Sequence, residues 1–278
     1  MKVCVSGASG FLGKYVLSEL LNRKVEIIPL IRTNRNAKLL SNYQNLKIID
    51  HHDINSYKKN KKLFSENLIH LAWSGLPNYQ SDEHILKELP SQFEFLEHLI
   101  KLGVKNITVA GTCLEYGMRN GCLNESMKVN PKNPYGIAKE YLYRKLQNLK
   151  KVYSFNLQWC RIFYVYGKGQ HKNSLWSQIS KAVENKKFFF EMSGGEQIRD
   201  FMHVNDVAHK LVSLHLMGSD VGIVNICSAK PISVKKIVNT WIENNQWNIV
   251  PKYHIYPYTE YEPMSFWGSN TKLNNLLG

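Results

Sequence analysis

A short apolar segment followed at once by three regularly spaced glycines constrains the fold of this chain more than any other feature. Residues 2–6 have the composition of a buried strand, and Gly7, Gly10 and Gly13 lead from it into a segment with the apolar periodicity of a helix. Glycines at such a turn let the backbone approach a phosphate closely, and the N–H groups and dipole of the helix favour the anion. The turn therefore predicts a dinucleotide site rather than a plain tight turn. The expected contacts are Gly7, Ser9, Gly10, Phe11, Leu12 and Gly13.

Strand-like and helix-like segments alternate after this turn, with Gly and Pro between them. This order favours an α/β fold built on a doubly wound parallel sheet. The expected helix at residues 81–102 contains Pro90, which should kink it, because proline cannot donate a backbone hydrogen bond. The expected strands lie at residues 2–6, 25–31, 46–50, 67–72, 106–110 and 156–162.

Tyr135 and Lys139 lie four residues apart at the start of a predicted helix. Asn133 can act as its N-cap, and Pro134 suits the first helical position. Residues with this spacing share one helix face, so the ammonium should favour the phenolate and lower the pKa of Tyr135 from about 10 toward neutral. A tyrosine tuned in this way can exchange a proton with a carbonyl or alcohol oxygen. In an arbitrary helix, the same spacing more often means packing beside a solvated lysine.

Residues at the ends of the predicted strands complete the expected site, because doubly wound folds bind ligands at the carboxyl ends of their strands. Thr112 follows the fifth strand and is placed to hydrogen-bond a reacting oxygen. Further cofactor contacts are expected near the ends of the third and fourth strands, from Asp53, Ile54, Leu71 and Ala72.

The end of the second strand bears on which cofactor is used. An acid there binds the ribose 2′-hydroxyl of NAD, whereas an arginine accommodates the 2′-phosphate of NADP. Residues 31–35 contain no acid but include Arg32 and Arg35. We therefore expect NADPH, with NADH as the alternative, and Arg32 before Arg35 as the phosphate contact. The alternative interpretation is that Arg32 and Arg35 are solvent-exposed loop residues that do not bind the cofactor.

The formal net charge of +14 allows two interpretations, a nucleic-acid surface or a lysine-rich solvated surface. The dense basic run at residues 58–62 has no interleaved aromatic residues on which bases could stack, so no nucleic-acid partner is expected. A positive field would also attract an anionic ligand such as a nucleotide diphosphate. His51, His52 and Asp53 adjoin one another and cannot easily converge on one metal ion, so no metal is expected either.

The five cysteines are odd in number and show no paired metal-binding spacing, which suits reduced thiols. No apolar run reaches the length needed to span a membrane, and no signal peptide precedes the first strand. We therefore expect a cytoplasmic protein without a membrane partner.

Six segments, in this order along the chain, resemble those of the extended short-chain dehydrogenases/reductases, the NAD-dependent epimerase/dehydratase family. They are the glycine triplet, residues 70–72, Thr112 with residues 116–117, Tyr135 with Lys139, residues 165–167 and residues 199–207. The resemblance implies that Thr112, Tyr135 and Lys139 are the catalytic trio, and that Arg199 binds the substrate diphosphate. The expected substrate-binding residues are Trp73, Cys113, Tyr164 and Arg199.

The resemblance also implies how the chain is divided. A Rossmann dinucleotide-binding domain is expected at residues 1–163, with residues 200–227 returning to it. A smaller C-terminal substrate-binding domain is expected from residues 164–199 and 228–278. The family further implies a homodimer packed through two helices per subunit, at residues 93–102 and 135–149.

Two departures from the family narrow the expected reaction. The sugar nucleotide 4,6-dehydratases place Asp-Glu directly after the catalytic Thr to remove water, whereas this chain has Cys113 and Leu114, which cannot supply that acid–base pair. The epimerase-reductases that make GDP-fucose have a cysteine at the position of Leu114. Residues 70–79 and 111–118 instead resemble the dTDP-4-keto-6-deoxyhexose reductases.

The expected function is therefore NADPH-dependent reduction of the C4 ketone of a nucleotide-linked 4-keto-6-deoxyhexose. We expect dTDP as the nucleotide, and a role in deoxysugar biosynthesis for surface polysaccharide such as O-antigen. Two alternatives remain open. A 4-epimerase would keep NAD bound and return the hydride to the other face of the sugar. A non-catalytic dinucleotide sensor would bind a protein partner, but such proteins often lose the Tyr or the Lys that this chain keeps.

Overall fold

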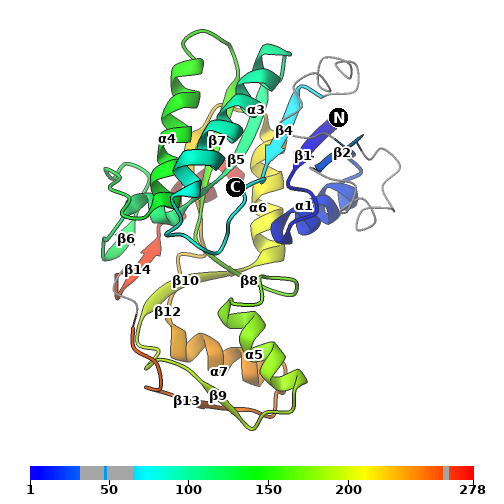
Figure 1. Cartoon of the computed structure of the whole chain (residues 1–278). Coiled ribbons are helices and arrows are strands. Elements are labelled where there is room, and N and C mark those ends of the chain that lie inside the picture. Colours follow the sequence, from blue (N-terminus) through cyan, green and yellow to red (C-terminus); the bar gives the residue numbers. More distant parts are fainter. Residues whose placement is uncertain (32–46, 49–64, 259–262) are drawn as a thin grey trace.

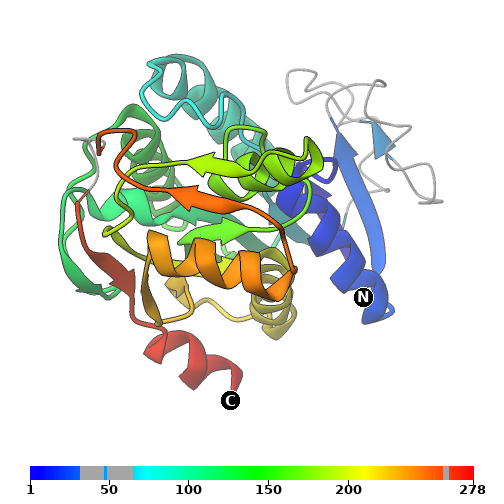
Figure 2. The ribbon, with the colours of Figure 1, turned by 90° about the horizontal axis from the view of Figure 1, so that it is seen from below.

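The computed structural model describes residues 1–31, 47–48, 65–258 and 263–278. A large sheet with helices on both faces forms the upper part of Figure 1. Smaller sheets with helices α5 (Leu175–Glu184) and α7 (Val234–Asn244) form the lower part. Figure 2, seen from below, shows these smaller sheets and helices in front of the large sheet.

Seven parallel strands form the large sheet in the described part of the chain. They are β1 (Lys2–Ser6), β2 (Glu26–Ile31), β3 (Lys47–Ile48), β4 (Asn67–His70), β5 (Asn106–Thr112), β7 (Asn156–Ile162) and β11 (Gly222–Ile226). Their order across the sheet is β11–β7–β5–β4–β1–β2–β3, and every neighbouring pair is parallel. The chain order reverses between β1 and β4, as in doubly wound folds. The predicted Rossmann sheet is thereby confirmed.

Helices cover both faces of this sheet because each buries an apolar stripe against the strands. On one face, α1 (Phe11–Asn22) and α6 (Val204–Met217) share a hydrophobic core with β1. On the other face, α3 (Leu89–Lys101) and α4 (Pro134–Leu149) share a second core with β4, β5 and β7. The sheet is therefore dry on both sides, as parallel sheets usually are.

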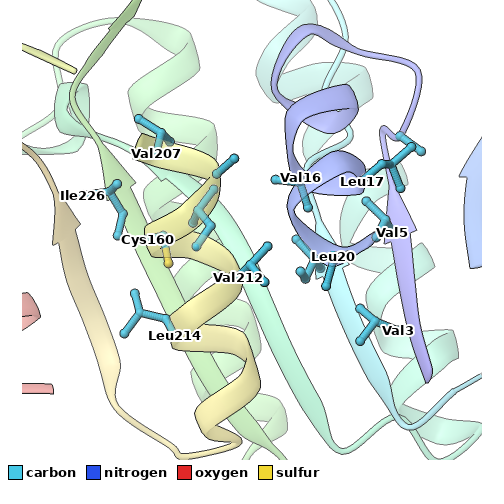
Figure 3. Packing of buried hydrophobic residues seen from close by; sticks show 14 of the residues in the cluster. Val3, Val5, Val16, Leu17, Leu20, Cys160, Val207, Val212, Leu214 and Ile226 are labelled. Atoms are coloured by element: carbon cyan, nitrogen blue, oxygen red, sulfur yellow. The ribbon is translucent and has the colours of Figure 1, made fainter. Parts of the chain in front are cut away.

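Figure 3 shows the core between α1 and α6 from close by. Val16 and Leu20 of α1 lie opposite Val212 of α6, with Val5 of β1 and Cys160 of β7 in the same cluster. All five side chains are fully buried. Burial of an apolar side chain of this kind contributes about 1.5–3 kcal/mol relative to exposure. Helix α6, which comes much later in the sequence, therefore completes the cover over the N-terminal strand and helix.

The helix expected at residues 81–102 is made of two kinds of helix. A π-helical turn, η3 (His84–Glu88), leads directly into α3, and Pro90 stands in the first turn of α3. Proline has no N–H to donate to the carbonyl one turn earlier, so a regular α-helical hydrogen-bond pattern cannot pass through it. The disturbance predicted at Pro90 therefore takes the form of a change of helix type.

The lower part of the molecule has its own core. Trp176 of α5 and Trp241 of α7 have ring centroids 5.0 Å apart, and Tyr166 lies equally close to Trp241. The chain passes from β10 (Ile198–His203) straight into α6, so this part is joined to the large sheet there. The bounds predicted for two domains stay predictions. The remaining elements are η4 (Cys113–Tyr116), β6 (Gly121–Leu123), β8 (Tyr164–Tyr166), β9 (Phe189–Glu191), β10 (Ile198–His203), β12 (Pro231–Ser233), β13 (Val250–Lys252), β14 (Phe266–Gly268) and α8 (Thr271–Leu277).

The close packing of the glycine turn leads to a test of stability. A Cβ on Gly13 would lie 2.2 Å from the carbonyl oxygen of Gly7, whereas a Cβ on Gly10 would lie 3.1 Å from the same atom. We expect Gly13→Ala to force the turn apart and to lower the free energy of unfolding by about 1–3 kcal/mol. Gly10→Ala is the control, with a smaller loss. Urea unfolding of both variants checks this, and equal midpoints would contradict it.

Candidate active site

The carboxyl ends of β1, β4 and β5 meet where the strand order reverses. The backbone N–H of Leu71, after β4, donates to the carbonyl of Ser6, at the end of β1, at 3.2 Å. Gly7 has a φ of +70°, and a Cβ there would lie 2.7 Å from the backbone nitrogen of Ala72. The positive φ and the close approach to Ala72 both require glycine at position 7. Thr112 ends β5 beside them, so the residues predicted from three separate strands do lie at one edge of the sheet.

The N-terminus of α1 is suited to an anion. The helix has neither a side-chain N-cap nor an acidic residue in its first turn. Its first N–H groups have no intrahelical acceptor, and the helix dipole favours negative charge there. The N–H of Gly10 donates to the carbonyl of Gly7 at 2.9 Å, which closes the turn. These features fit the diphosphate of a dinucleotide, and the individual contacts of residues 7–13 stay predictions.

Tyr135 and Lys139 are buried on the same face of α4. The helix begins as predicted, because the side-chain oxygen of Asn133 accepts a hydrogen bond from the N–H of Gly136 at 2.8 Å. The Nζ of Lys139 lies 5.8 Å from the centre of the Tyr135 ring and donates to the carbonyl of Ala110 at 2.8 Å. The pair is therefore held against the end of β5 rather than in solvent.

The predicted fall in the pKa of Tyr135 is wrong for the protein by itself. Burial raises the pKa of this phenol well above its usual range, and the nearby Tyr79 and Glu115 raise it further. Burial also lowers the pKa of Lys139 to about 7, although the carboxylates of Glu115 and Glu88 oppose that shift. Loss of water disfavours the charged form of each group, and it is the largest cause of both shifts. At neutral pH the phenol is therefore protonated.

Aromatic rings surround this pair. The indole of Trp73 has its centre 3.9 Å from the Nζ of Lys139 and packs edge-on against Tyr135, with the two ring centroids 5.8 Å apart. Its N–H donates to the Nδ1 of His84 at 3.1 Å, and the Nε2 of His84 donates to the carbonyl of Asn78 at 2.8 Å. Trp73 is predicted to contact substrate. Sequence reasoning missed His84, for which the available signal was a histidine on the apolar side of the predicted helix.

A capping box holds Thr112. The N–H of Thr112 donates to the carboxylate of Glu115 at 2.8 Å, and the Thr112 hydroxyl accepts from the N–H of Leu114 at 3.3 Å. Glu115 is fully buried and also accepts from the guanidinium of Arg161 at 2.7 Å and from the indole of Trp159 at 3.0 Å. The orientation of Thr112 therefore depends on a carboxylate three residues further on.

The buried ion pair between Glu115 and Arg161 was also missed. Burial raises the pKa of Glu115, against the pull of the Arg161 charge. Burial alone would lower the pKa of Arg161, but the carboxylate of Glu115 and the phenol of Tyr116 together raise it. A second carboxylate, that of Glu140, lies 3.5 Å from Arg161. The sequence did offer a signal for this pair, because Glu115 and Arg161 each stand within a largely apolar segment.

The residues predicted to contact substrate come from different elements of the fold. Cys113 is buried in η4. Arg199 is 3% exposed, donates to the hydroxyl of Tyr164 at 3.2 Å, and has its guanidinium carbon 4.8 Å from the centre of the Phe266 ring. It also donates to the carbonyl of Met264 at 3.3 Å. The structure thus joins Arg199 to Tyr164, and the substrate contacts themselves stay predictions.

Several predicted residues lie outside the described residues, namely Arg32, Arg35, His51, His52, Asp53 and Ile54. Where the structure describes the chain, no group of three or more His, Cys, Asp or Glu side chains is arranged to hold a metal ion. Over the same ranges, none of the helices has both the length and the apolar character needed to cross a membrane.

A doubly wound parallel sheet, a glycine turn at its reversal point and a buried Tyr–Lys pair beside it define a dinucleotide-dependent enzyme of the Rossmann class. The sequence agrees with this class. The chain belongs to the NAD dependent epimerase/dehydratase family, whose model matches residues 3–227. The resemblance drawn from six sequence segments is thereby confirmed.

Two relatives illustrate the similarity. The chain is 32% identical over 275 residues to a dTDP-6-deoxy-L-talose 4-dehydrogenase (NAD(+)) of Aggregatibacter actinomycetemcomitans, across 97% of this chain and 100% of the relative. It is 24% identical over 257 residues to a dTDP-4-dehydro-6-deoxyglucose reductase of Escherichia coli, across 86% of this chain and 80% of the relative.

Solved structures agree on the fold. MoeE5 in complex with UDP-glucuronic acid and NAD has a TM-score of 0.81 and 25% identity, with 100% of this chain and 93% of that chain covered. A UDP-glucose 4-epimerase of Thermotoga maritima has a TM-score of 0.85 and 21% identity, with 99% and 92% covered.

The buried ion pair provides a second test. Arg161→Met removes the main countercharge of the Glu115 carboxylate, so we expect a loss of about 3–5 kcal/mol in the free energy of unfolding. The double variant Glu115→Gln/Arg161→Met leaves no buried charge at this pair and should recover part of the loss. Urea unfolding of both variants at pH 7 measures the difference. A single variant as stable as the double variant would contradict the expectation that the unpaired carboxylate of Glu115 causes the loss.

Proposed function

We propose that this protein reduces the C4 ketone of a nucleotide-linked 4-keto-6-deoxyhexose with a nicotinamide dinucleotide, NADPH in preference to NADH. The observation that carries this proposal is the buried pair of Tyr135 and Lys139 beside Thr112, with no acid directly after Thr112. The relative that shares 32% identity supports it, because a 4-dehydrogenase acting in reverse is a 4-keto reductase. dTDP is the proposed nucleotide, since it occurs in the names of both relatives described above.

Reduction at one carbon needs fewer protein groups than dehydration. Removal of water across two carbons requires an acid and a base besides the tyrosine. Cys113 and Leu114 occupy the two positions after Thr112, and neither provides a carboxyl group. Reduction of a ketone requires one proton at the oxygen, which Tyr135 can donate.

Each residue of the trio has a role that follows from its surroundings. A nicotinamide dinucleotide held by these residues would supply the hydride. Tyr135 donates the proton to the C4 oxygen, and its raised pKa keeps the phenol in the protonated form that this step requires. The ammonium of Lys139 has three donors, of which one reaches Ala110, so others can hold the nicotinamide ribose. Thr112 orients the ketone through its hydroxyl. Proton donation of this kind contributes about 10²–10⁴-fold to the rate.

A 4-epimerase with bound NAD is the second candidate. The fold similarity to MoeE5, whose structure contains UDP-glucuronic acid and NAD, favours it. The same tyrosine would then first remove a proton and later return it. Nicotinamide absorbance separates the candidates, because a reductase consumes NADPH in proportion to product and an epimerase shows no net change.

Three further features stay proposals from the family resemblance. They are a homodimer packed through α3 and α4, a cytoplasmic location, and a role in the biosynthesis of surface polysaccharide. The packing of α3 beside α4 on one face of the sheet is compatible with the proposed interface.

Tyr135→Phe tests the proton donor. We expect turnover of dTDP-4-keto-6-deoxyglucose to fall at least about 10²-fold, because the variant keeps the ring but cannot donate a proton. NADPH binding, followed by fluorescence, should persist. Tyr141→Phe is the matched control, because this tyrosine lies on the same helix and is 54% exposed. Full turnover by Tyr135→Phe would overturn the assignment of the donor.

Arg32→Ala tests the preference for NADPH. A guanidinium–phosphate contact contributes roughly 1.5–3 kcal/mol, which corresponds to a preference of roughly 10- to 150-fold. We expect a lower KM for NADPH than for NADH in the natural protein, and a KM for NADPH that rises selectively in Arg32→Ala. Arg35→Ala tests the second candidate and should leave the KM for NADPH nearly unchanged if Arg32 makes the contact.

The 32% identical relative is named for NAD(+) rather than NADP, so the comparison of KM values for the two cofactors is a direct test of the proposed preference. Equal KM values for the two cofactors in the natural protein would refute the preference. An unchanged ratio in Arg32→Ala would refute the residue.

A further inference from the structure

The hydrogen bonds around His84 fix one form of its ring. The carbonyl of Asn78 can only accept, so the Nε2 of His84 at 2.8 Å must carry the proton. The Nδ1 of the neutral ring is then an acceptor, and it takes the indole N–H of Trp73 at 3.1 Å. An indole has a single polar atom. The hydrogen bond from this N–H to the fully buried His84 therefore sets the orientation of the Trp73 ring.

The backbone is shaped to place His84 there. His84 begins the π-helical turn η3. This type of helix is rare in proteins overall, but where it occurs it is often found at functional sites. Gly75 has a φ of +82°, and a Cβ there would lie 3.0 Å from the Cε1 of His84. The glycine thus leaves room for the ring of His84, whose centroid lies 6.3 Å from that of Trp73.

The face of the Trp73 ring is in turn a partner for Lys139. Its centre lies 3.9 Å from the Nζ, and Lys139 is 1% exposed. A cation over an indole face gains most when it is desolvated. The ring therefore supports the ammonium where burial acts against it. The Trp73 and His84 rings also lie against Tyr135, with centroids 5.8 Å and 5.3 Å from it.

We propose that His84 is a positioning residue for the reaction, because it orients the Trp73 ring that holds the ammonium of Lys139. The proposal rests on the proposed function for its kinetic consequence, but not for its structural one. His84 would act through Trp73 and would not touch the substrate. The other titratable groups that face Lys139 are Glu115 of η4, Glu88 of η3 and Tyr135 of its own helix.

The test compares His84→Leu, which removes the acceptor, with His84→Asn, whose amide oxygen can replace Nδ1. Without a fixed indole face the ammonium loses a favourable partner, so the pKa of Lys139 should fall below its present value of about 7. Because turnover requires the ammonium, the alkaline limb of the pH dependence of kcat should move by about one unit to lower pH in His84→Leu. His84→Asn should keep the limb near that of the natural protein.

A double variant separates positioning from a merely structural role. If His84 acts through the indole, Trp73→Leu should move the limb as His84→Leu does, and His84→Leu/Trp73→Leu should move it no further. If the alkaline limb of the pH dependence of kcat does not move in His84→Leu, the proposal is overturned, even if kcat itself is lower. A second, additive shift in the double variant would also overturn it. Thermal unfolding confirms that each variant is folded.

A measurement without substrate distinguishes this proposal from the proposed function. The signal of ¹³Cε-labelled Lys139 can be titrated by NMR in the natural protein and in His84→Leu. A fall of about one unit in its pKa supports positioning even if no 4-keto sugar is turned over. An unchanged titration overturns positioning even if the enzyme proves to be a reductase.

Discussion

The exclusion of water from a few ionisable side chains at the end of β5 is the constraint on which the site depends. Glu115 and Arg161 are tolerated there because each supplies the charge and hydrogen bonds that the other has lost with its water. The same dry surroundings raise the pKa of Tyr135 and lower that of Lys139. One environment therefore holds Thr112 through its capping box and also sets the protonation of the groups beside it.

This environment suits ketone reduction in particular. Reduction consumes a proton at the substrate oxygen, and a buried phenol with a raised pKa begins in the form that can give it. The tyrosinate left behind gains from a nearby ammonium, so the position of Lys139 matters more after proton transfer than before it. Rings without net charge, above all that of Trp73, can hold this ammonium without neutralising it.

The sequence predicted what is decided locally. The turn at Gly7, the cap at Asn133 and the bounds of β7 each follow from a few neighbouring residues, and the structure agrees with them. The ion pair of Glu115 with Arg161 could not be predicted, because its partners lie 46 positions apart in the sequence, one in η4 and one in β7. The direction of the pKa shift of Tyr135 was also predicted wrongly, because that shift depends mainly on how deeply the side chain is buried. Spacing along a helix shows which charge is near, whereas the depth of burial depends on the whole fold.

The position of α6 affects the order in which this chain can fold during synthesis. The apolar faces of β1 and α1 are covered by a helix that is made only after the whole of α5, β9 and β10. Strand β11, which ends the sheet beside β7, is made later still. A nascent chain that has completed the glycine turn therefore keeps an uncovered apolar surface until α5, β9, β10 and α6 have left the ribosome. Such exposed surfaces are where chaperones bind and where unfinished chains aggregate.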